Sequence, residues 1–298
     1  MQMKMAIIGA ASHLGSELLR VLSQEEAAAF ARGDCDVTDV KSLETALTPR
    51  RFDVAINLSS YNRVDDSEAD PAPAMAVNAE GAGNVAHVAA QIGAAVCYVS
   101  TDYVFGADAE RNAPYAEDDE PGPINAYGRS KLEGERLVRR ANPDHLIVRT
   151  SGLFGAAKRQ GTTFPEVMLA KAAAGEPIRV VDDQTVTPTY VPELAEKMIE
   201  VLRSGARGIV HLSNSGSCTW YEFACEIFRQ TGLSPDLAPI SSEEFGAAAR
   251  RPAYSVMTSK RLPELGIEPM RPWQDCVRAW LAGEERRRTL TRQRRLPK

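Results

Sequence analysis

The residues with the clearest capacity for chemistry are a tyrosine and a lysine four positions apart, Tyr127 and Lys131. If a helix begins near Asn125, these two side chains lie on one of its faces. A phenol titrates at about 10, and a neighbouring ammonium stabilises the phenolate, so we expect Tyr127 to exchange protons more readily near neutral pH. The spacing alone also fits an ordinary surface helix on which a cation lies beside an aromatic ring.

A hydroxyl that could complete such a site is Thr101. It follows the apolar residues 94–99, which predict a buried strand. At the carboxyl end of that strand, the Thr101 hydroxyl could hold a substrate carbonyl beside the Tyr127 phenol.

A cofactor turn is predicted near the N-terminus. The apolar residues 3–8 are followed by small residues from Gly9 to Gly15 and then by helical periodicity over residues 16–22. Strand, tight turn and helix together place a pyrophosphate at a helix N-terminus. The glycine pattern is incomplete because Ser12 stands where a middle glycine is expected, so an ordinary strand–helix turn remains an alternative. We expect His13 to line the pocket or face solvent.

The next segment is less informative. Residues 24–32 are rich in alanine, and we predict no second strand ending in an acid, so the sequence leaves NAD versus NADP open. Asp36 or the backbone of Val37 could meet the adenine end of a cofactor. Thr38 is predicted to cap a helix over residues 40–47.

The remaining pattern predicts an α/β protein with a doubly wound, Rossmann-type parallel sheet. Buried-strand candidates at residues 52–58, 94–99, 146–150 and 208–212 alternate with helices. We assign residues 1–151 and about 182–214 to the dinucleotide-binding domain. A smaller C-terminal α/β substrate domain takes about 152–181 and 215–283, and residues 284–298 form a basic tail that we predict to be disordered.

Composition narrows the function classes. The 298 residues carry a net charge of −5, with 44% hydrophobic and 25% charged residues, as in ordinary globular proteins. No apolar run approaches the ~20 residues of a membrane span, and no signal peptide is recognisable. The five cysteines are scattered without metal-ligand spacing, which predicts a reducing cytoplasm and no metal site. Residues 286–298 hold six Arg and one Lys without an acid, but the rest of the chain is acidic, so we expect no nucleic-acid partner.

In order along the chain, several segments resemble the dTDP-4-dehydrorhamnose reductase family of extended short-chain dehydrogenase/reductases. The likeness runs from Met3 to about Leu281. The most specific part is Ser-Thr-Asp-Tyr-Val-Phe at residues 100–105, followed by Tyr-Gly-Arg-Ser-Lys-Leu-Glu-Gly-Glu at residues 127–135. The other matching segments are residues 36–39, 64–68, 77–79, 149–151, 183–184, 188–190 and 251–252.

The resemblance implies reduction of the C4 ketone of dTDP-4-dehydro-β-L-rhamnose to dTDP-β-L-rhamnose by NADPH or NADH. In that reading Tyr127 donates the proton, Lys131 lowers the pKa of Tyr127 and holds the cofactor ribose, and Thr101 binds the carbonyl. Asp102 and Gly152 are expected beside the substrate. The remaining cofactor contacts implied are Gly9, Ser12, His13, Leu14, Asp36, Val37, Ser60, Tyr61 and Asn62.

Three departures from the family pattern stand out: the first bears on pyrophosphate binding, and the other two leave open which sugar is reduced. Ser12 replaces a glycine, the loop at residues 59–62 differs from the usual one, and Gly152 replaces a tryptophan that packs on the sugar. The alternatives are a reductase or epimerase of another dTDP-4-keto-6-deoxyhexose, or a non-catalytic regulatory subunit like the β subunit of methionine adenosyltransferase. A dehydratase fits residues 103–105 less well. A Mg²⁺ requirement and a homodimer are left open.

Overall fold

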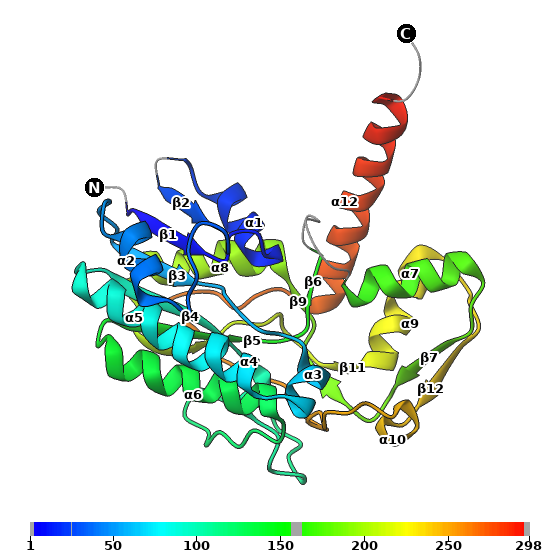
Figure 1. Ribbon diagram of the computed structural model, residues 1–298. Helices are drawn as coiled ribbons and strands as arrows, with labels where there is room; N and C mark the ends of the chain where they lie inside the picture. The colour runs from blue at the N-terminus through cyan, green and yellow to red at the C-terminus, as the bar shows by residue number, and fades with distance from the viewer. Residues whose placement is uncertain (1–2, 25, 156–162, 295–298) are drawn as a thin grey trace.

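The computed structural model describes residues 3–24, 26–155 and 163–294, with side chains described up to Gly283. A six-stranded sheet forms its larger part (Figure 1). The strands are β1 (Met5–Ile8), β2 (Ala27–Phe30), β3 (Val54–Asn57), β4 (Ala95–Thr101), β5 (His145–Thr150) and β10 (Gly208–His211). Their order is β10-β5-β4-β3-β1-β2, and all neighbours are parallel. The predicted doubly wound, Rossmann-type sheet is confirmed.

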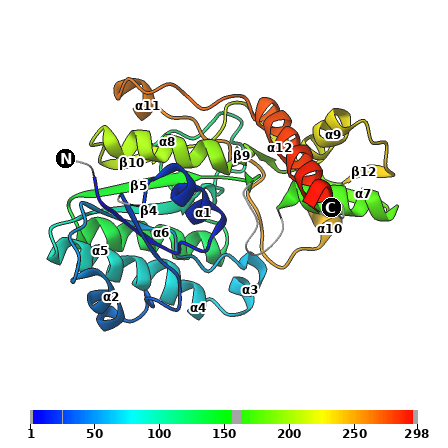
Figure 2. The ribbon, with the colours of Figure 1, turned by 90° about the horizontal axis from the view of Figure 1, so that it is seen from above.

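Helices cover both faces of this sheet (Figure 2). On one face lie α1 (His13–Val21) and α8 (Val191–Arg203); on the other lie α2 (Val40–Leu47), α5 (Gly81–Gln91) and α6 (Ala126–Ala141). Side chains alternate across a strand, so β1 sends Met5 and Ile7 into the first core and Ala6 and Ile8 into the second. Burial on both faces explains why these strands read as continuous apolar runs.

The strand order reverses at β1: β2 is added on one side of β1, and β3 and the later strands are added on the other. In open parallel sheets, ligands bind outside the carboxyl ends of the strands at such a point. The segments that follow β3 and β4 along the chain are α3 (Val64–Ala69), α4 (Ala72–Ala74), the π-helix η1 (Met75–Glu80) and the 3₁₀ helix η2 (Asp102–Val104).

A smaller lobe stands beside the carboxyl ends of the sheet (Figure 1). Its strand pairs are β6 (Leu153–Phe154) with β9 (Thr189–Tyr190), β7 (Ile178–Val181) with β12 (Leu237–Ile240), and β8 (Thr185–Val186) with β11 (Cys218–Thr219). Its helices are α7 (Phe164–Ala174), α9 (Trp220–Thr231), α10 (Ser242–Phe245) and α12 (Trp273–Arg294), while α11 (Arg261–Glu264) packs against the main sheet. An aromatic core built around Phe154, Phe223 and Trp273 holds this lobe together.

Three local features differ from the sequence expectations or extend them. For the alanine-rich segment we predicted no second strand ending in an acid; β2 is present there, and it ends at Phe30. Its three alanines have weak strand propensity, and it is a short edge strand. Asp39, not Thr38, caps α2, because the Thr38 hydroxyl is bonded to the Asp36 carboxylate. Helix α12 continues to Arg294, into the segment predicted as a basic tail, whose last residues 295–298 lie outside the described residues.

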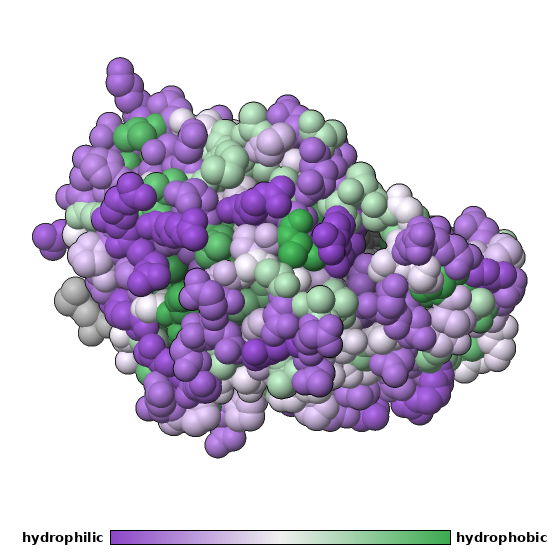
Figure 3. Space-filling model, turned by 90° about the horizontal axis from the view of Figure 1, so that it is seen from below, coloured by the Kyte–Doolittle hydropathy of each residue, from purple (hydrophilic) through white to green (hydrophobic). Residues whose placement is uncertain are grey.

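The face shown in Figure 3 is predominantly hydrophilic, and apolar side chains appear there only in small separate patches. Within residues 3–24, 26–155 and 163–294, no helix combines the length and the apolar character that crossing a membrane requires.

Candidate active site

Tyr127 and Lys131 lie on α6, as predicted, and Thr101 ends the neighbouring strand β4. The Asn125 side chain caps α6 by accepting the amide N–H of Gly128 at 2.7 Å. A Cβ atom on Gly128 would lie 2.1 Å from the carbonyl oxygen of Tyr103. The glycine after Tyr127 therefore lets α6 approach the end of β4 closely enough to form one site.

Two hydroxyls, those of Thr101 and Ser60, lie close enough to the Tyr127 phenol to influence its pKa. Burial raises the pKa of Tyr127 to about 12, the nearby Asp102 carboxylate adds to the rise, and the two hydroxyls oppose it. The sequence suggested the opposite direction for this pKa. In the structure the phenol is a protonated donor at neutral pH.

The Lys131 ammonium points to the backbone and not to the Tyr127 hydroxyl. Its Nζ donates to the Val99 carbonyl at 2.7 Å and lies 4.1 Å from the ring centroid of Tyr98. The side chain is 2% exposed, and this burial lowers the pKa of Lys131 to about 7, against the pull of Glu135. Lys131 is therefore a cation that is close to losing its charge near neutral pH.

Glu135, one helical turn after Lys131 on α6, forms a buried ion pair with Arg149. Glu135 accepts from Arg149 Nε at 2.9 Å and from a terminal nitrogen of Arg149 at 2.7 Å. The Ser100 hydroxyl donates to the same carboxylate at 2.6 Å. This pair joins α6 to the ends of β4 and β5, and removing one partner of such a buried pair typically costs about 3–5 kcal/mol of stability. We did not identify this pair as functional from the sequence, although both residues fall in the family segments.

Asn78 of η1 holds the loop after β3. Its side-chain oxygen accepts the N–H of Tyr61 at 2.8 Å, and its amide nitrogen donates to the Tyr61 carbonyl at 3.0 Å and to the Ser130 hydroxyl at 2.9 Å. Through Asn78, the backbone of Tyr61 is therefore linked to Ser130 of α6. The structure brings the predicted Ser60 to the phenol, whereas Asn78 was noted in the sequence without a role.

Asp102 lies in η2 and is 4% exposed. Its Oδ1 accepts the Thr101 hydroxyl at 3.0 Å, and its Oδ2 accepts the Ser255 hydroxyl at 2.6 Å. Burial raises the pKa of Asp102 to about 6, although these hydroxyls and the backbone N–H groups of Asp102 and Tyr103 favour the carboxylate. The carboxyl is directed into the protein, and Ser255 gave no signal in the sequence.

The β1–α1 turn fits a dinucleotide pyrophosphate. Gly9 has φ 83°, and a Cβ there would lie 3.0 Å from the backbone of Leu58 and Ser59. Ser12 caps α1 by accepting the N–H of Gly15 at 3.1 Å. The serine that replaces the family glycine thus starts the helix whose N-terminal N–H groups would face the phosphates.

The other predicted cofactor residues are distributed around this turn. His13 is the first residue of α1, while the Leu14 side chain is buried in the core, so only its backbone is available. Asp36 accepts the N–H and hydroxyl of Thr38, which lower the pKa of Asp36, with a smaller effect from Arg32. The Val37 carbonyl accepts the Asn84 amide at 3.0 Å.

Arg32 is a residue that the sequence analysis missed because β2 was not recognised. It lies exposed two positions beyond β2, where a dinucleotide fold places the group that meets the adenosine ribose. Ala31 precedes it, and the nearby Asp34 carboxylate accepts the Ala31 N–H at 2.7 Å. The first charged residue after the second strand is therefore a cation and not an acid. This favours a cofactor whose adenosine ribose carries a 2′-phosphate over one with a free 2′-hydroxyl.

Gly152 lies between β5 and β6 with φ 51°. A Cβ at this position would lie 3.0 Å from the Thr187 carbonyl oxygen and 3.1 Å from Pro188 Cα. The family tryptophan is thus replaced by a residue in a conformation that side-chain-bearing residues rarely adopt. The following β6 exposes Leu153, and residues 156–162 lie outside the described residues.

Asp65 and Arg251 form an ion pair with two hydrogen bonds. The two terminal nitrogens of Arg251 donate to Oδ1 and Oδ2 of Asp65 at 2.9 and 2.7 Å. These hydrogen bonds from Arg251 lower the pKa of Asp65 to about 2. The pair ties α3 to residues 249–255, and a polar cavity of about 460 Å³ beside it is lined by Asn62, Arg63, Val64, Asp65, Asp66 and Arg251.

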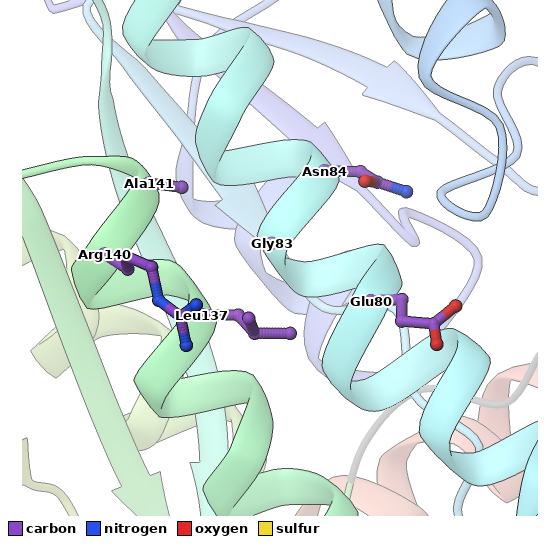
Figure 4. A pocket seen from close by; sticks show the side chains of 6 residues that line it. All are labelled: Glu80, Gly83, Asn84, Leu137, Arg140 and Ala141. Carbon is purple, nitrogen blue, oxygen red and sulfur yellow. The ribbon is translucent and has the colours of Figure 1, made fainter.

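A second cavity, of about 390 Å³, lies away from this chemistry between the outer surfaces of α5 and α6 (Figure 4). It is lined by Glu80, Gly83, Asn84, Leu137, Arg140 and Ala141. Within the described part of the chain, no group of three or more His, Cys, Asp or Glu residues could hold a metal ion.

The chain is similar to known proteins over nearly its whole length. A family model described as the RmlD substrate binding domain matches residues 3–285. The dTDP-4-dehydrorhamnose reductase of Mycolicibacterium smegmatis is 37% identical over 93% of this chain and 84% of that protein. A probable dTDP-4,6-dihydroxy-2-methyloxan-3-one 4-ketoreductase of Streptomyces antibioticus is 39% identical over 93% of this chain and 94% of its own length. The crystal structure of dTDP-4-dehydrorhamnose reductase from Bacillus anthracis in complex with NADP is 36% identical, with a TM-score of 0.90, covering 95% of this chain and all of that one.

Proposed function

The chain belongs to the dTDP-4-dehydrorhamnose reductase family, and we propose that it reduces the C4 ketone of dTDP-4-dehydro-β-L-rhamnose to dTDP-β-L-rhamnose with NADPH. The observation that carries this proposal is that the Thr101 and Ser60 hydroxyls lie beside the Tyr127 phenol, with Thr101 at the carboxyl end of β4. The protein is an oxidoreductase of deoxysugar nucleotide biosynthesis.

In this reaction the bound nicotinamide supplies the hydride to the ketone carbon. Tyr127 gives its phenolic proton to the carbonyl oxygen, so that one hydride on the carbon and one proton on the oxygen together form the alcohol. Thr101 and Ser60 hold the oxygen atoms in place, and the Lys131 cation stabilises the negative charge left on the phenol. We expect Lys131 also to bind the cofactor ribose, as the family resemblance implies.

The choice of NADPH is supported by Arg32. A guanidinium forms strong, charge-assisted hydrogen bonds with phosphate oxygens. Its place beyond β2, next to Ala31 and not to an acid, favours the cofactor that carries a 2′-phosphate. Gly9, Ser12 and His13 would hold the pyrophosphate.

A second candidate is reduction of another dTDP-4-keto-6-deoxyhexose. Gly152 favours this second candidate, because the tryptophan that packs on the sugar in the family is absent. At φ 51° the backbone also disfavours any other side chain at this position. The relative from Streptomyces antibioticus shows that ketoreductases of other dTDP-sugars are equally similar.

A turnover assay with NADPH and a panel of dTDP-4-keto-6-deoxyhexoses tests the proposal directly. We expect consumption of NADPH with dTDP-4-dehydro-β-L-rhamnose, and a decrease in kcat of about 10²–10⁴-fold in Tyr127→Phe with NADPH affinity nearly unchanged. Tight NADPH binding without turnover of any ketone would support the regulatory-subunit alternative instead. Unchanged turnover in Tyr127→Phe would refute the assigned mechanism.

The proposal extends to a cytoplasmic location, where a sugar nucleotide and NADPH are both present, and it is compatible with a homodimer. All five cysteines are free thiols. Light scattering of the purified protein measures the oligomeric state, and fractionation of cells locates the protein.

A further inference from the structure

The Asp102 carboxyl faces two protein hydroxyls. Thr101 Oγ1 donates to one oxygen at 3.0 Å and Ser255 Oγ donates to the other at 2.6 Å. Asp102 and Ser255 are 4% and 1% exposed, so this arrangement is shielded from bulk water. Ser255 is itself anchored, since its backbone N–H donates to the Thr185 carbonyl of β8 at 3.0 Å.

This arrangement limits what Thr101 can do. A hydroxyl has one proton to donate and two lone pairs to accept with. The Thr101 proton is given to Asp102, and its oxygen accepts the Tyr103 N–H at 3.2 Å. While Asp102 is a carboxylate, Thr101 can accept a hydrogen bond from Tyr127 but has no proton left for a ketone oxygen.

We propose that Asp102 is a positioning residue that sets the direction of the Thr101 hydroxyl. As a carboxylate it holds the Thr101 proton; as a carboxylic acid it donates to Thr101 Oγ1, and the Thr101 proton turns toward the ketone. This inference rests on the proposed reduction. The proton that ends on the product still comes from Tyr127, and no covalent bond of Thr101 or Asp102 breaks.

The surroundings allow this change of protonation state near neutral pH. Burial places the pKa of Asp102 at about 6, well above that of an exposed carboxyl. The titratable groups that face it are two phenols, Tyr103 of η2 and Tyr127 of α6, both raised by burial and by Asp102 and therefore neutral at this pH. The segment of residues 249–258 contributes the neutral Ser255, with Arg251 lying beyond Tyr103.

The test compares kcat/KM from pH 5 to pH 8 in the wild type and in Asp102→Asn. The asparagine amide can donate to Thr101 at every pH and so imitates the protonated acid. We expect the ratio of variant to wild-type kcat/KM to rise about tenfold across a step centred near pH 6. The ratio cancels any titration of Lys131, which both proteins share.

Ser255→Ala gives a second, independent variant. It removes one hydrogen bond that favours the carboxylate, so the wild-type step should move to higher pH. Asp53→Asn is the matched control, because it makes the same chemical change at an exposed carboxylate that binds the Lys4 N–H far from the site. It should leave the pH profile unchanged.

Thermal unfolding of each variant separates loss of structure from loss of positioning. A constant ratio across the pH range, or a folded Asp102→Asn that is inactive at every pH, would overturn the inference. Absence of turnover in the wild type would count against the proposed function itself, and not against the role of Asp102 alone. In that case we expect Asp102→Asn and Ser255→Ala to bind NADPH as the wild type does.

Discussion

The turn after β1 and the turn after β5 both pass through a left-handed glycine, Gly9 at φ 83° and Gly152 at φ 51°. In both, a Cβ would lie 3.0 Å from backbone atoms of another segment. Both turns also depart from the family pattern, through Ser12 in the first and Gly152 itself in the second. Their consequences differ because of what each turn presents to a ligand.

The first turn presents backbone. Its helix N-terminus offers N–H groups, and Ser12 serves as the cap of that helix, so replacing the family glycine preserves the feature that binds phosphate. The second turn presents side chains, and loss of a tryptophan changes the surface that meets the sugar. A site built from backbone tolerates substitution, whereas a site built from side chains changes its specificity.

The largest effect should follow from Gly9→Val. A β-branched residue at φ 83° is strained, and its Cβ would meet the Leu58 and Ser59 backbone. We expect the free energy of unfolding to fall by about 2–3 kcal/mol and NADPH to bind more than about tenfold more weakly. Urea unfolding and a fluorescence titration measure both. Gly33→Ala is the control, since nothing lies within 4 Å of a Cβ there; equal effects of the two would remove the geometric explanation.

Gly152→Trp should have the next largest effect. Restoring the family residue at φ 51° should lower the free energy of unfolding by about 1–3 kcal/mol without raising kcat/KM on dTDP-4-dehydro-β-L-rhamnose. Gly175→Ala isolates backbone strain, because Gly175 has φ 68° in open space. A stable Gly152→Trp variant with improved turnover would mean that the two turns behave alike.

Arg32→Ala should weaken NADPH binding about tenfold and leave NADH binding unchanged. In contrast to the backbone of the first turn, Arg32 is expected to act through its side chain. Titration with adenosine 2′,5′-bisphosphate and with AMP measures the effect without catalysis. Equal losses for both nucleotides would show that Arg32 does not read the 2′-phosphate.

Ser12→Gly should have the smallest effect. Glycine is nearly as good a helix cap as serine, so we expect a loss of only a few tenths of a kcal/mol in stability and about a twofold change or less in NADPH affinity. Calorimetry and the same titration check this. A large loss of affinity would show that the Ser12 hydroxyl itself binds the cofactor.

Much of the fold could be predicted because its signals are local. Buried strands such as β4 read as apolar runs, and α6 begins at Ala126, directly after its cap Asn125, close to the predicted start. β2 could not be predicted, since Ala27–Phe30 forms a strand only by pairing with β1. Arg32 was missed for the same reason, because its position has meaning only once β2 is placed.

The order of motifs in the sequence determined the family, the ketone reduction and the position of Tyr127 and Lys131 on one helix face, because residues four apart lie about one turn apart wherever the helix lies. Only the tertiary structure decided the pKa values of the site residues and the hydrogen-bond partners of Asp102. Burial raises the pKa of Tyr127 and lowers that of Lys131, and Ser255, 153 residues beyond Asp102, completes the carboxyl's hydrogen bonds. Desolvation and long-range contacts depend on what the folded chain packs around a group, which spacing along the sequence does not specify.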